Sequence, residues 1–152
     1  MPLDLHAELR GIVRALDAAG IPYALAGGLA VSIYAQPRAT EDIDILVVPS
    51  DAPQVVARVA SLGYRQAGTA MSVAGDRLRI QRLIKIDGTD LVPLDLLLPN
   101  DAELAALLTT PQRIEWGEDR LSLVSLEGLR TLKRLRGSAQ DRADLAALGL
   151  DS

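Results

Sequence analysis

Apolar residues recur at helical spacing in some segments of this chain and at strand spacing in others, so the pattern predicts a series of short helices and strands. Near the N-terminus the helical spacing predicts a helix over 3–19 that ends at Gly20. The same criteria predict helices at 28–35, 52–62, 102–109, about 125–136 and 138–148, strands at 23–26, 42–48, 64–67, 78–86 and 91–98, two short strands within 112–124, and a loop at 68–76.

This mixture of elements predicts an α/β (α+β) fold, built on a mixed β-sheet with flanking helices and a small C-terminal helical pair. We expect a single domain over 1–152, with a core at about 20–100 and the C-terminal helices at about 125–149.

A hairpin is predicted in the second half of that core. Asp87-Gly88-Thr89 marks a turn between the strands at 78–86 and 91–98. Even-numbered residues of the first strand form a mainly apolar face, and odd-numbered residues form a wetter face. Asp95 lies in the middle of the second strand, between two leucines.

Two carboxylates fall on one face of the strand at 42–48. Because side chains alternate along a strand, Asp42 and Asp44 point the same way. Like charges this close repel, and burying an unpaired charge costs several kcal/mol, roughly. A hard divalent cation such as Mg²⁺ is the usual compensation for clustered carboxylates. Earlier in the chain, Gly27-Gly28 forms a turn into a helix, where backbone N–H groups can approach a phosphate.

The order of these motifs resembles the nucleotidyltransferase superfamily of the polymerase-β type, in particular its minimal and AbiEii-like branches. Gly27-Gly28 matches the family's turn, and Asp42-x-Asp44 matches its acid pair. Arg38-x-Thr40 is similar to the Arg-x-Thr of the AbiEii-like branch. The resemblance implies that Asp95 is the third acid, with Asp90 beside the hairpin turn as the alternative.

The resemblance implies a metal-dependent transfer of a nucleoside monophosphate from an NTP to an acceptor. Asp42 and Asp44 would bridge two Mg²⁺ ions, with Mn²⁺ as an alternative, and Asp95 would hold the catalytic ion and accept the proton of the attacking hydroxyl. The remaining implied contacts are with the nucleotide: Gly27 and Gly28 cradle the polyphosphate, Arg38 and Thr40 contact phosphate or lie in a solvated loop, and Lys133 reaches the triphosphate or lies on a solvated helix face. Asp141 and Asp144 are expected to brace the last helix.

Composition narrows the set of partners. The chain has no cysteine, so a disulfide framework, a thiolate metal site and a cysteine nucleophile are excluded. Its net charge of −4 disfavours a large nucleic acid as partner, although a local basic cleft is still compatible with the sequence. The N-terminus lacks a signal-peptide pattern and no apolar run is long enough to span a bilayer, so we expect no membrane association and a cytoplasmic protein.

Two functions remain open at this point. The first is an active enzyme whose acceptor is a small molecule, a tRNA end or a protein hydroxyl. Because AbiEii-like members include toxins of toxin–antitoxin pairs, the resemblance also implies a cognate antitoxin as a candidate partner. The second is a catalytically silent module that binds a nucleotide or a partner protein.

Overall fold

The computed structural model describes residues 3–35, 42–136 and 139–149 of the chain. One mixed sheet organises them, with strand order β3-β5-β6-β2-β1-β8-β7 and β4 added beside β5. The strands are β1 (Ala24–Ala26), β2 (Ile43–Leu46), β3 (Arg65–Gln66), β4 (Met71–Val73), β5 (Leu78–Asp87), β6 (Asp90–Pro99), β7 (Gln112–Trp116) and β8 (Asp119–Leu123). The pairs β2–β6 and β1–β8 are parallel, and the other pairs are antiparallel. The α/β (α+β) prediction is confirmed.

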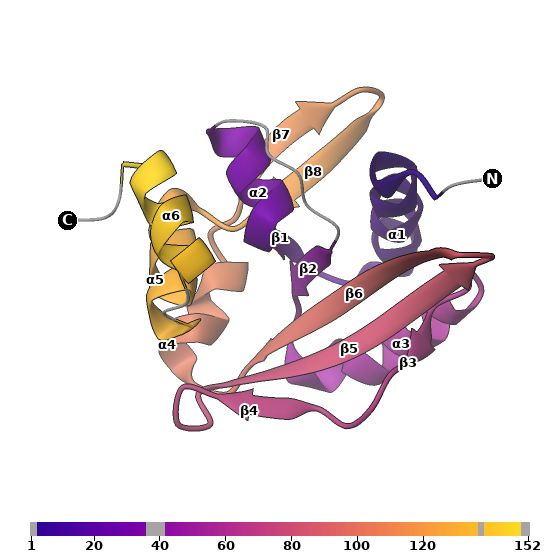
Figure 1. Ribbon diagram of the computed structural model, residues 1–152, viewed down its shortest axis with the longest axis horizontal. Helices are drawn as coiled ribbons and strands as arrows, with labels where there is room; N and C mark the ends of the chain where they lie inside the picture. The colour runs from indigo at the N-terminus through magenta and orange to yellow at the C-terminus, as the bar shows by residue number, and fades with distance from the viewer. Residues whose placement is uncertain (1–2, 36–41, 137–138, 150–152) are drawn as a thin grey trace.

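The helices are α1 (Leu5–Ala19), α2 (Gly27–Tyr34), α3 (Ala52–Ala60), α4 (Ala102–Ala105), α5 (Leu126–Arg136) and α6 (Ala139–Ala147), with 3₁₀ turns at Pro49–Asp51 and Ala106–Leu108. The predicted helix at 102–109 is therefore a four-residue α-helix followed by a three-residue 3₁₀-helix. Figure 1 shows α5 and α6 side by side at one end of the molecule, as the predicted C-terminal helical pair.

Local sequence signals explain the helix ends. The Asp4 carboxylate accepts hydrogen bonds from the backbone N–H groups of His6 and Ala7 and so caps α1. At its other end Gly20 takes the left-handed conformation, with φ of 69°. Asp101 caps α4 by accepting from the N–H of Leu104 at 2.8 Å.

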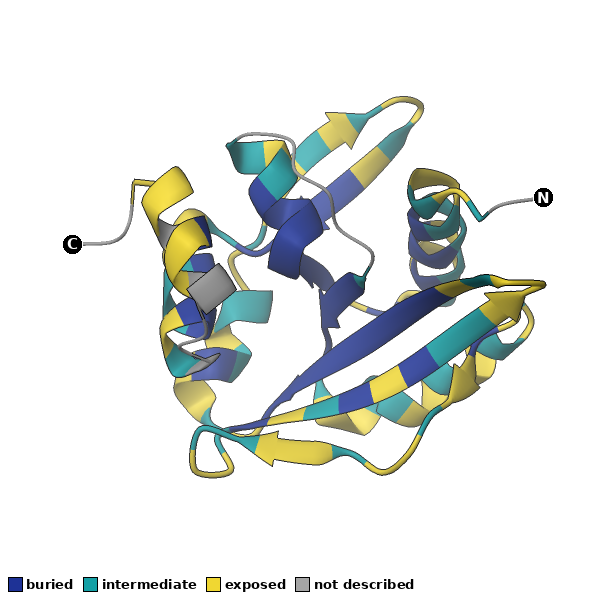
Figure 2. Ribbon diagram, in the orientation of Figure 1, coloured by how far each residue is buried: buried dark blue, intermediate teal, exposed yellow. Residues whose placement is uncertain are grey.

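The core lies between the central strands and the helices α1 and α3. Figure 2 shows β1, β2 and most of β6 buried, whereas the outer strands carry exposed residues. Each fully buried Leu, Ile or Val contributes about 1.5–3 kcal/mol. The largest side chains less than 2% exposed include Leu9, Ile12 and Leu16 of α1 and Leu25, Ile43, Ile45, Leu94 and Leu96 of the sheet.

Two details of the sequence prediction are wrong. The segment 68–76, predicted as a loop, contains β4, because Met71–Val73 pairs with β5 and gains its strand structure from that non-local pairing. The supposedly wetter face of β5 holds the buried Gln81 and Leu83, whereas Ile86 on the apolar face is 67% exposed. The wetter face is buried because helices cover it: Lys85 Nζ donates to Glu8 of α1 at 2.9 Å.

In the part of the chain that the structure describes, none of the helices combines the length and the apolar character that crossing a membrane requires.

Candidate active site

A row of register-matched residues crosses four neighbouring strands on one face of the sheet. Ala26 of β1 pairs with Asp44 of β2, and Asp44 pairs with Asp95 of β6. Asp95 in turn pairs with Arg82 of β5. Residues paired in register share a face, and neighbouring strands lie about 4.8 Å apart. The sheet therefore brings the predicted strand acid and the predicted third acid side by side.

Arg82 binds Asp95 of this row and lies close to Asp42, which immediately precedes β2. Its Nε donates to Asp95 Oδ1 at 2.8 Å and its Nη2 donates to Asp95 Oδ2 at 2.9 Å, which is the two-pronged geometry of strong Arg–carboxylate pairs. The same Nη2 lies 3.6 Å from Asp42 Oδ2. The hydrogen bond to Asp95, and then the charges of Asp95, Asp42 and Asp44, raise the pKa of the Arg82 guanidinium, against an opposing effect of desolvation.

Gly27 lies directly against Asp44. A Cβ built on residue 27 would lie 1.9 Å from Asp44 Oδ2, and the backbone of Gly27 has a φ of 65°. Both observations require glycine at this position. Because Gly27 is the first residue of α2, the Asp44 carboxylate lies at a helix N-terminus, where the helix dipole favours negative charge.

The acids differ in exposure. Asp44 and Asp95 are each 8% exposed, whereas the Asp42 side chain is 44% exposed. Burying a carboxylate costs free energy unless opposite charge or hydrogen bonds compensate it, and at Asp95 the Arg82 guanidinium supplies both.

Hard oxygen donors in this arrangement suit a divalent cation such as Mg²⁺ or Mn²⁺. The positively charged guanidinium of Arg82 forms an ion pair with Asp95, so the space beside this carboxylate already holds a cationic group. Among the residues that the structure describes, no three acids or histidines form a ready-made metal cluster. The donor set fits a cation, although Arg82 engages Asp95.

Of the other predicted nucleotide contacts, the structure describes Gly28 and Lys133. Gly28 is buried as the second residue of α2. Arg38 and Thr40 lie outside the described residues. Lys133 of α5 is 5% exposed, and its Nζ donates to Asp144 Oδ2 of α6 at 2.9 Å. The alternative that Lys133 lies on a solvated helix face is therefore wrong, because the packing of α6 against α5 buries it. Asp144 thus braces the two last helices, as predicted.

Asp90, the alternative third acid, lies outside the row. It pairs with Asp87 at the end of the hairpin, and its Oδ2 accepts a hydrogen bond from the backbone N–H of Leu3 at 2.8 Å. Its five-residue separation from Asp95 along β6 places it far from Asp44, since each strand residue advances about 3.3 Å.

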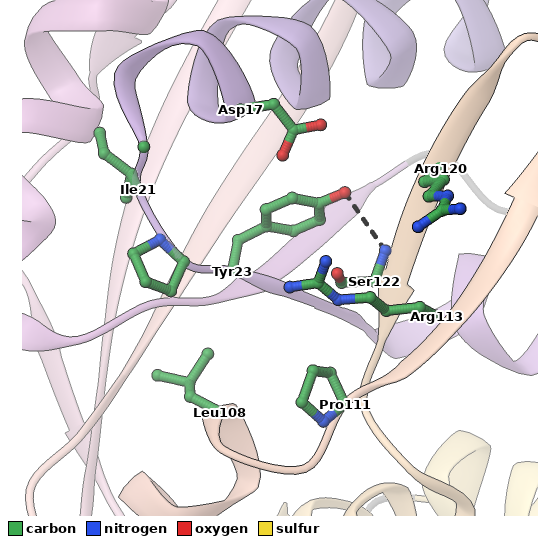
Figure 3. Close-up of a pocket in the computed structure, with 10 residues that line it drawn as sticks. Asp17, Ile21, Tyr23, Leu108, Pro111, Arg113, Arg120 and Ser122 are labelled. Carbon is green, nitrogen blue, oxygen red and sulfur yellow. Dashed lines mark hydrogen bonds between the residues drawn. The ribbon is translucent and has the colours of Figure 1, made fainter.

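A pocket of about 360 Å³ lies elsewhere (Figure 3). Its lining includes Arg113, Arg120 and Tyr23, whose hydroxyl accepts from the backbone N–H of Ser122 at 3.2 Å. Burial raises the pKa of the Tyr23 hydroxyl, and Asp17 at the rim also has a raised pKa through burial. Tyr23 precedes β1, whereas the last residue of β1 pairs with Asp44, so this pocket is at the opposite end of the strand.

Arg82 is the site residue that sequence reasoning missed. The sequence signal that could have identified Arg82 is the register of the β5–β6 hairpin. A two-residue turn at Gly88-Thr89 fixes the register from Asp87–Asp90 outward, and counting back from Asp95 reaches Arg82. The basic residues Arg77, Arg79, Arg82 and Lys85 of this stretch predict only a local basic cleft, because the acid that each one contacts depends on that register.

Residues 8–92 match the model of a family described as aminoglycoside-2''-adenylyltransferase. The matched segment contains Gly27, Asp44 and Arg82 and ends three residues before Asp95. No curated protein matches the sequence.

Several solved structures share the fold. Lincomycin-bound lincosamide antibiotic adenylyltransferase LnuA is 14% identical, with 100% of both chains covered and a TM-score of 0.63. A candidate nucleotidyltransferase from Thermotoga maritima is 16% identical, with 91% of this chain and 88% of that chain covered and a TM-score of 0.64. The enzyme ANT(2'')-Ia in complex with adenylyl-2''-tobramycin is 17% identical, with 94% and 84% covered and a TM-score of 0.59. The predicted superfamily is confirmed, but these matches do not place the chain in the AbiEii-like branch.

Proposed function

The chain belongs to the aminoglycoside-2''-adenylyltransferase family of nucleotidyltransferases, and we propose that it transfers a nucleoside monophosphate from an NTP to a small hydroxyl-bearing acceptor. The observation that carries this proposal is the register pairing of Asp44 with Asp95 beside the Gly27 turn. It supports a single site where two acids of different strands and a helix N-terminus come together.

The acids Asp42, Asp44 and Asp95 are the residues that would hold divalent cations, and Asp95 would lie next to the reacting hydroxyl. Such cations, when bound, neutralise charge on the reacting phosphate and lower the pKa of a bound hydroxyl. Asp95 is proposed to accept the proton of the acceptor hydroxyl. The low exposure of Asp44 and Asp95 supports this assignment, since water exclusion strengthens electrostatic interactions there.

The chain's backbone and cations are proposed to hold the polyphosphate. Gly27 and Gly28 begin α2, so their N–H groups are free of intrahelical partners by helix geometry and suit phosphate oxygens. Arg38 and Thr40 remain proposed phosphate contacts. Lys133 would have to leave Asp144 before it could reach a phosphate, so we propose that its first role is to hold α5 against α6.

The acceptor is proposed to be small. Two of the structural neighbours are described with lincomycin and with adenylyl-2''-tobramycin, both small molecules. A net charge of −4 disfavours a polyanionic acceptor such as tRNA and is compatible with a cationic one. A cytoplasmic location, an antitoxin partner and a protein acceptor remain predictions.

A catalytically silent, nucleotide-binding module is the second candidate. The observation that favours it is the Arg82–Asp95 pair, because both oxygens of the proposed catalytic carboxylate are engaged. In that case the fold would bind nucleotide without transfer.

The deciding experiment follows the label of α-³²P-ATP with Mg²⁺ onto a panel of aminoglycosides, lincosamides, tRNA and proteins. We expect labelled small-molecule product and equimolar pyrophosphate from the wild type, and none from Asp44→Asn. Asp87→Asn, an exposed acid at the hairpin end, is the matched control and should retain transfer. Nucleotide binding without transfer to any acceptor would support the silent module instead.

A further inference from the structure

Arg82 of β5 lies beside Asp95, its partner in the register-matched row that also contains Asp44. It bonds both oxygens of Asp95, at 2.8 and 2.9 Å, and lies 3.6 Å from Asp42. We infer that Arg82 takes the place of a divalent cation beside Asp95 in the cation-free protein, and that a cation binds there only by displacing it. This inference rests on the proposed function and concerns the regulation of that same site.

Competition follows from the geometry. A two-pronged guanidinium pair uses one lone pair of each carboxylate oxygen, so a cation at Asp95 would have to share both oxygens with the guanidinium. A cation on the same oxygens would also lie within a few ångströms of the guanidinium, where like charges repel. Asp95 therefore binds either the arginine or the cation.

The exposures of the two side chains show which one moves. Asp95 is held in a central strand with its side chain 11% exposed, whereas the Arg82 side chain is 47% exposed. Arg82 has a long flexible stem, so its guanidinium can turn into solvent while the backbone of β5 stays paired. Because solvent partly screens this pair, displacement reduces cation affinity only modestly, by roughly two- to fivefold.

Displacement also links the cation to the nucleotide. A released guanidinium suits phosphate oxygens, to which Arg binds in the same two-pronged way. The triphosphate then offers Arg82 a new partner, and the cation and nucleotide favour each other's binding reciprocally. The cation should therefore bind more tightly with nucleotide than alone, by a factor no larger than the one that displacement costs.

The test measures binding of Mn²⁺ alone, by electron paramagnetic resonance of the free ion, to the wild type and to Arg82→Gln. We expect Arg82→Gln to bind Mn²⁺ roughly two- to fivefold more tightly. Against a protein-free baseline of Mn²⁺ with ATP, which corrects for chelation by the nucleotide itself, ATP should improve Mn²⁺ binding less in this variant than in the wild type. Arg79→Gln is the matched control, because Arg79 is exposed three residues away on the opposite face of β5, and its Mn²⁺ affinity should equal that of the wild type.

Arg82→Lys provides a second variant if Arg82→Gln folds poorly, because lysine keeps the positive charge but cannot make the two parallel hydrogen bonds of a guanidinium. The Mn²⁺ affinity of Arg82→Lys should lie between those of the wild type and Arg82→Gln. Equal or weaker Mn²⁺ binding by both Arg82 variants, with the wild type binding Mn²⁺ in the presence of ATP, overturns the inference alone. If no variant binds Mn²⁺ even with ATP, the proposed function fails and the inference fails with it.

Discussion

Gly27 and the Asp44 carboxylate lie so close that residue 27 has no room for a side chain: an added Cβ would lie 1.9 Å from Asp44 Oδ2. The glycine that begins α2 thus fixes the position of the central acid of the site. The turn and the acid pair, which are separate motifs in the sequence, form one structural unit.

Gly27→Ala should therefore destabilise the protein on two grounds. The left-handed conformation costs a non-glycine residue about 1–2 kcal/mol, and the overlap with Asp44 adds about 1–3 kcal/mol. Urea unfolding measures the sum. Gly20→Ala is the control, because Gly20 has a similar φ of 69° but nothing within 4 Å of its added Cβ. Equal losses in the two variants would contradict the close contact.

Asp44→Asn separates a cation-binding acid from a structural one. Neutralising Asp44 relieves repulsion within the acid row but loses the favourable interaction with the N-terminus of α2, worth about 0.3–1 kcal/mol. We therefore expect the ligand-free variant to stay within about 1 kcal/mol of the wild type. Stabilisation by Mg²⁺ with NTP, roughly 2.7 kcal/mol at 100 times the dissociation constant, should disappear.

Melting curves of Asp44→Asn and Asp87→Asn, each with and without Mg²⁺ and NTP, provide the measurement. A structural acid would behave differently: its replacement would cost about 1–3 kcal/mol without ligand through a lost charge-assisted hydrogen bond. An Asp44→Asn variant with that loss and with the full ligand shift would refute the proposed role of this residue.

Lys133 and Asp144 form a buried ion pair between α5 and α6, with side chains 5% and 2% exposed. Lys133→Met should cost about 3–5 kcal/mol, because it leaves Asp144 charged in a buried position. Lys133→Met/Asp144→Leu should recover much of that loss, since two apolar side chains can replace a buried pair. Chemical denaturation of the wild type, both single variants and the double variant measures the coupling. A double variant as unstable as the sum of the single variants would show that the pair is not coupled.

Recognition of the nucleotide should depend on its phosphates. The chain has three tyrosines and one tryptophan, and each is engaged elsewhere. The hydroxyls of Tyr23, Tyr34 and Tyr64 contact Ser122, Val124 and Glu8, and the Trp116 ring lies 4.8 Å from Arg10. Without a stacked base, which is worth about 1–3 kcal/mol, we expect calorimetry to find the four NTPs within roughly tenfold of one another in affinity. A tight isotherm for one base alone would refute this prediction.

Asp119 should make stability depend on pH. Hydrogen bonds from Arg14, and then the charges of Arg14 and Arg10, lower the pKa of Asp119 in the folded protein. A lowered folded pKa gives stability that is present above the unfolded pKa, about 3.9, and is lost as the pH falls through the folded value. Asp119→Asn should therefore melt below the wild type at pH 7, and the difference should shrink towards pH 3. The neighbouring Glu118→Gln is the control; a gap for Asp119→Asn that is unchanged at pH 3 would contradict the assignment.

The sequence by itself determined the elements whose signals are local. Helical periodicity, Gly20 and the Asp4 cap defined α1, and the apolar run around Asp44 and the turn at Gly88 defined β2 and the β5–β6 hairpin. Gly27-Gly28 followed by Asp42-x-Asp44 also indicated the superfamily. Such patterns depend only on backbone periodicity and turn chemistry, so neighbouring residues suffice to reveal them.

Tertiary structure alone decided which side chains meet. It paired Asp44 with Asp95 across parallel strands that are far apart in sequence, and it set Arg82 on both oxygens of Asp95. It also buried Lys133 against Asp144 and made a strand of Met71–Val73. Each of these contacts depends on strand register or helix packing between distant segments, and local spacing does not specify which distant charge or strand will be the partner.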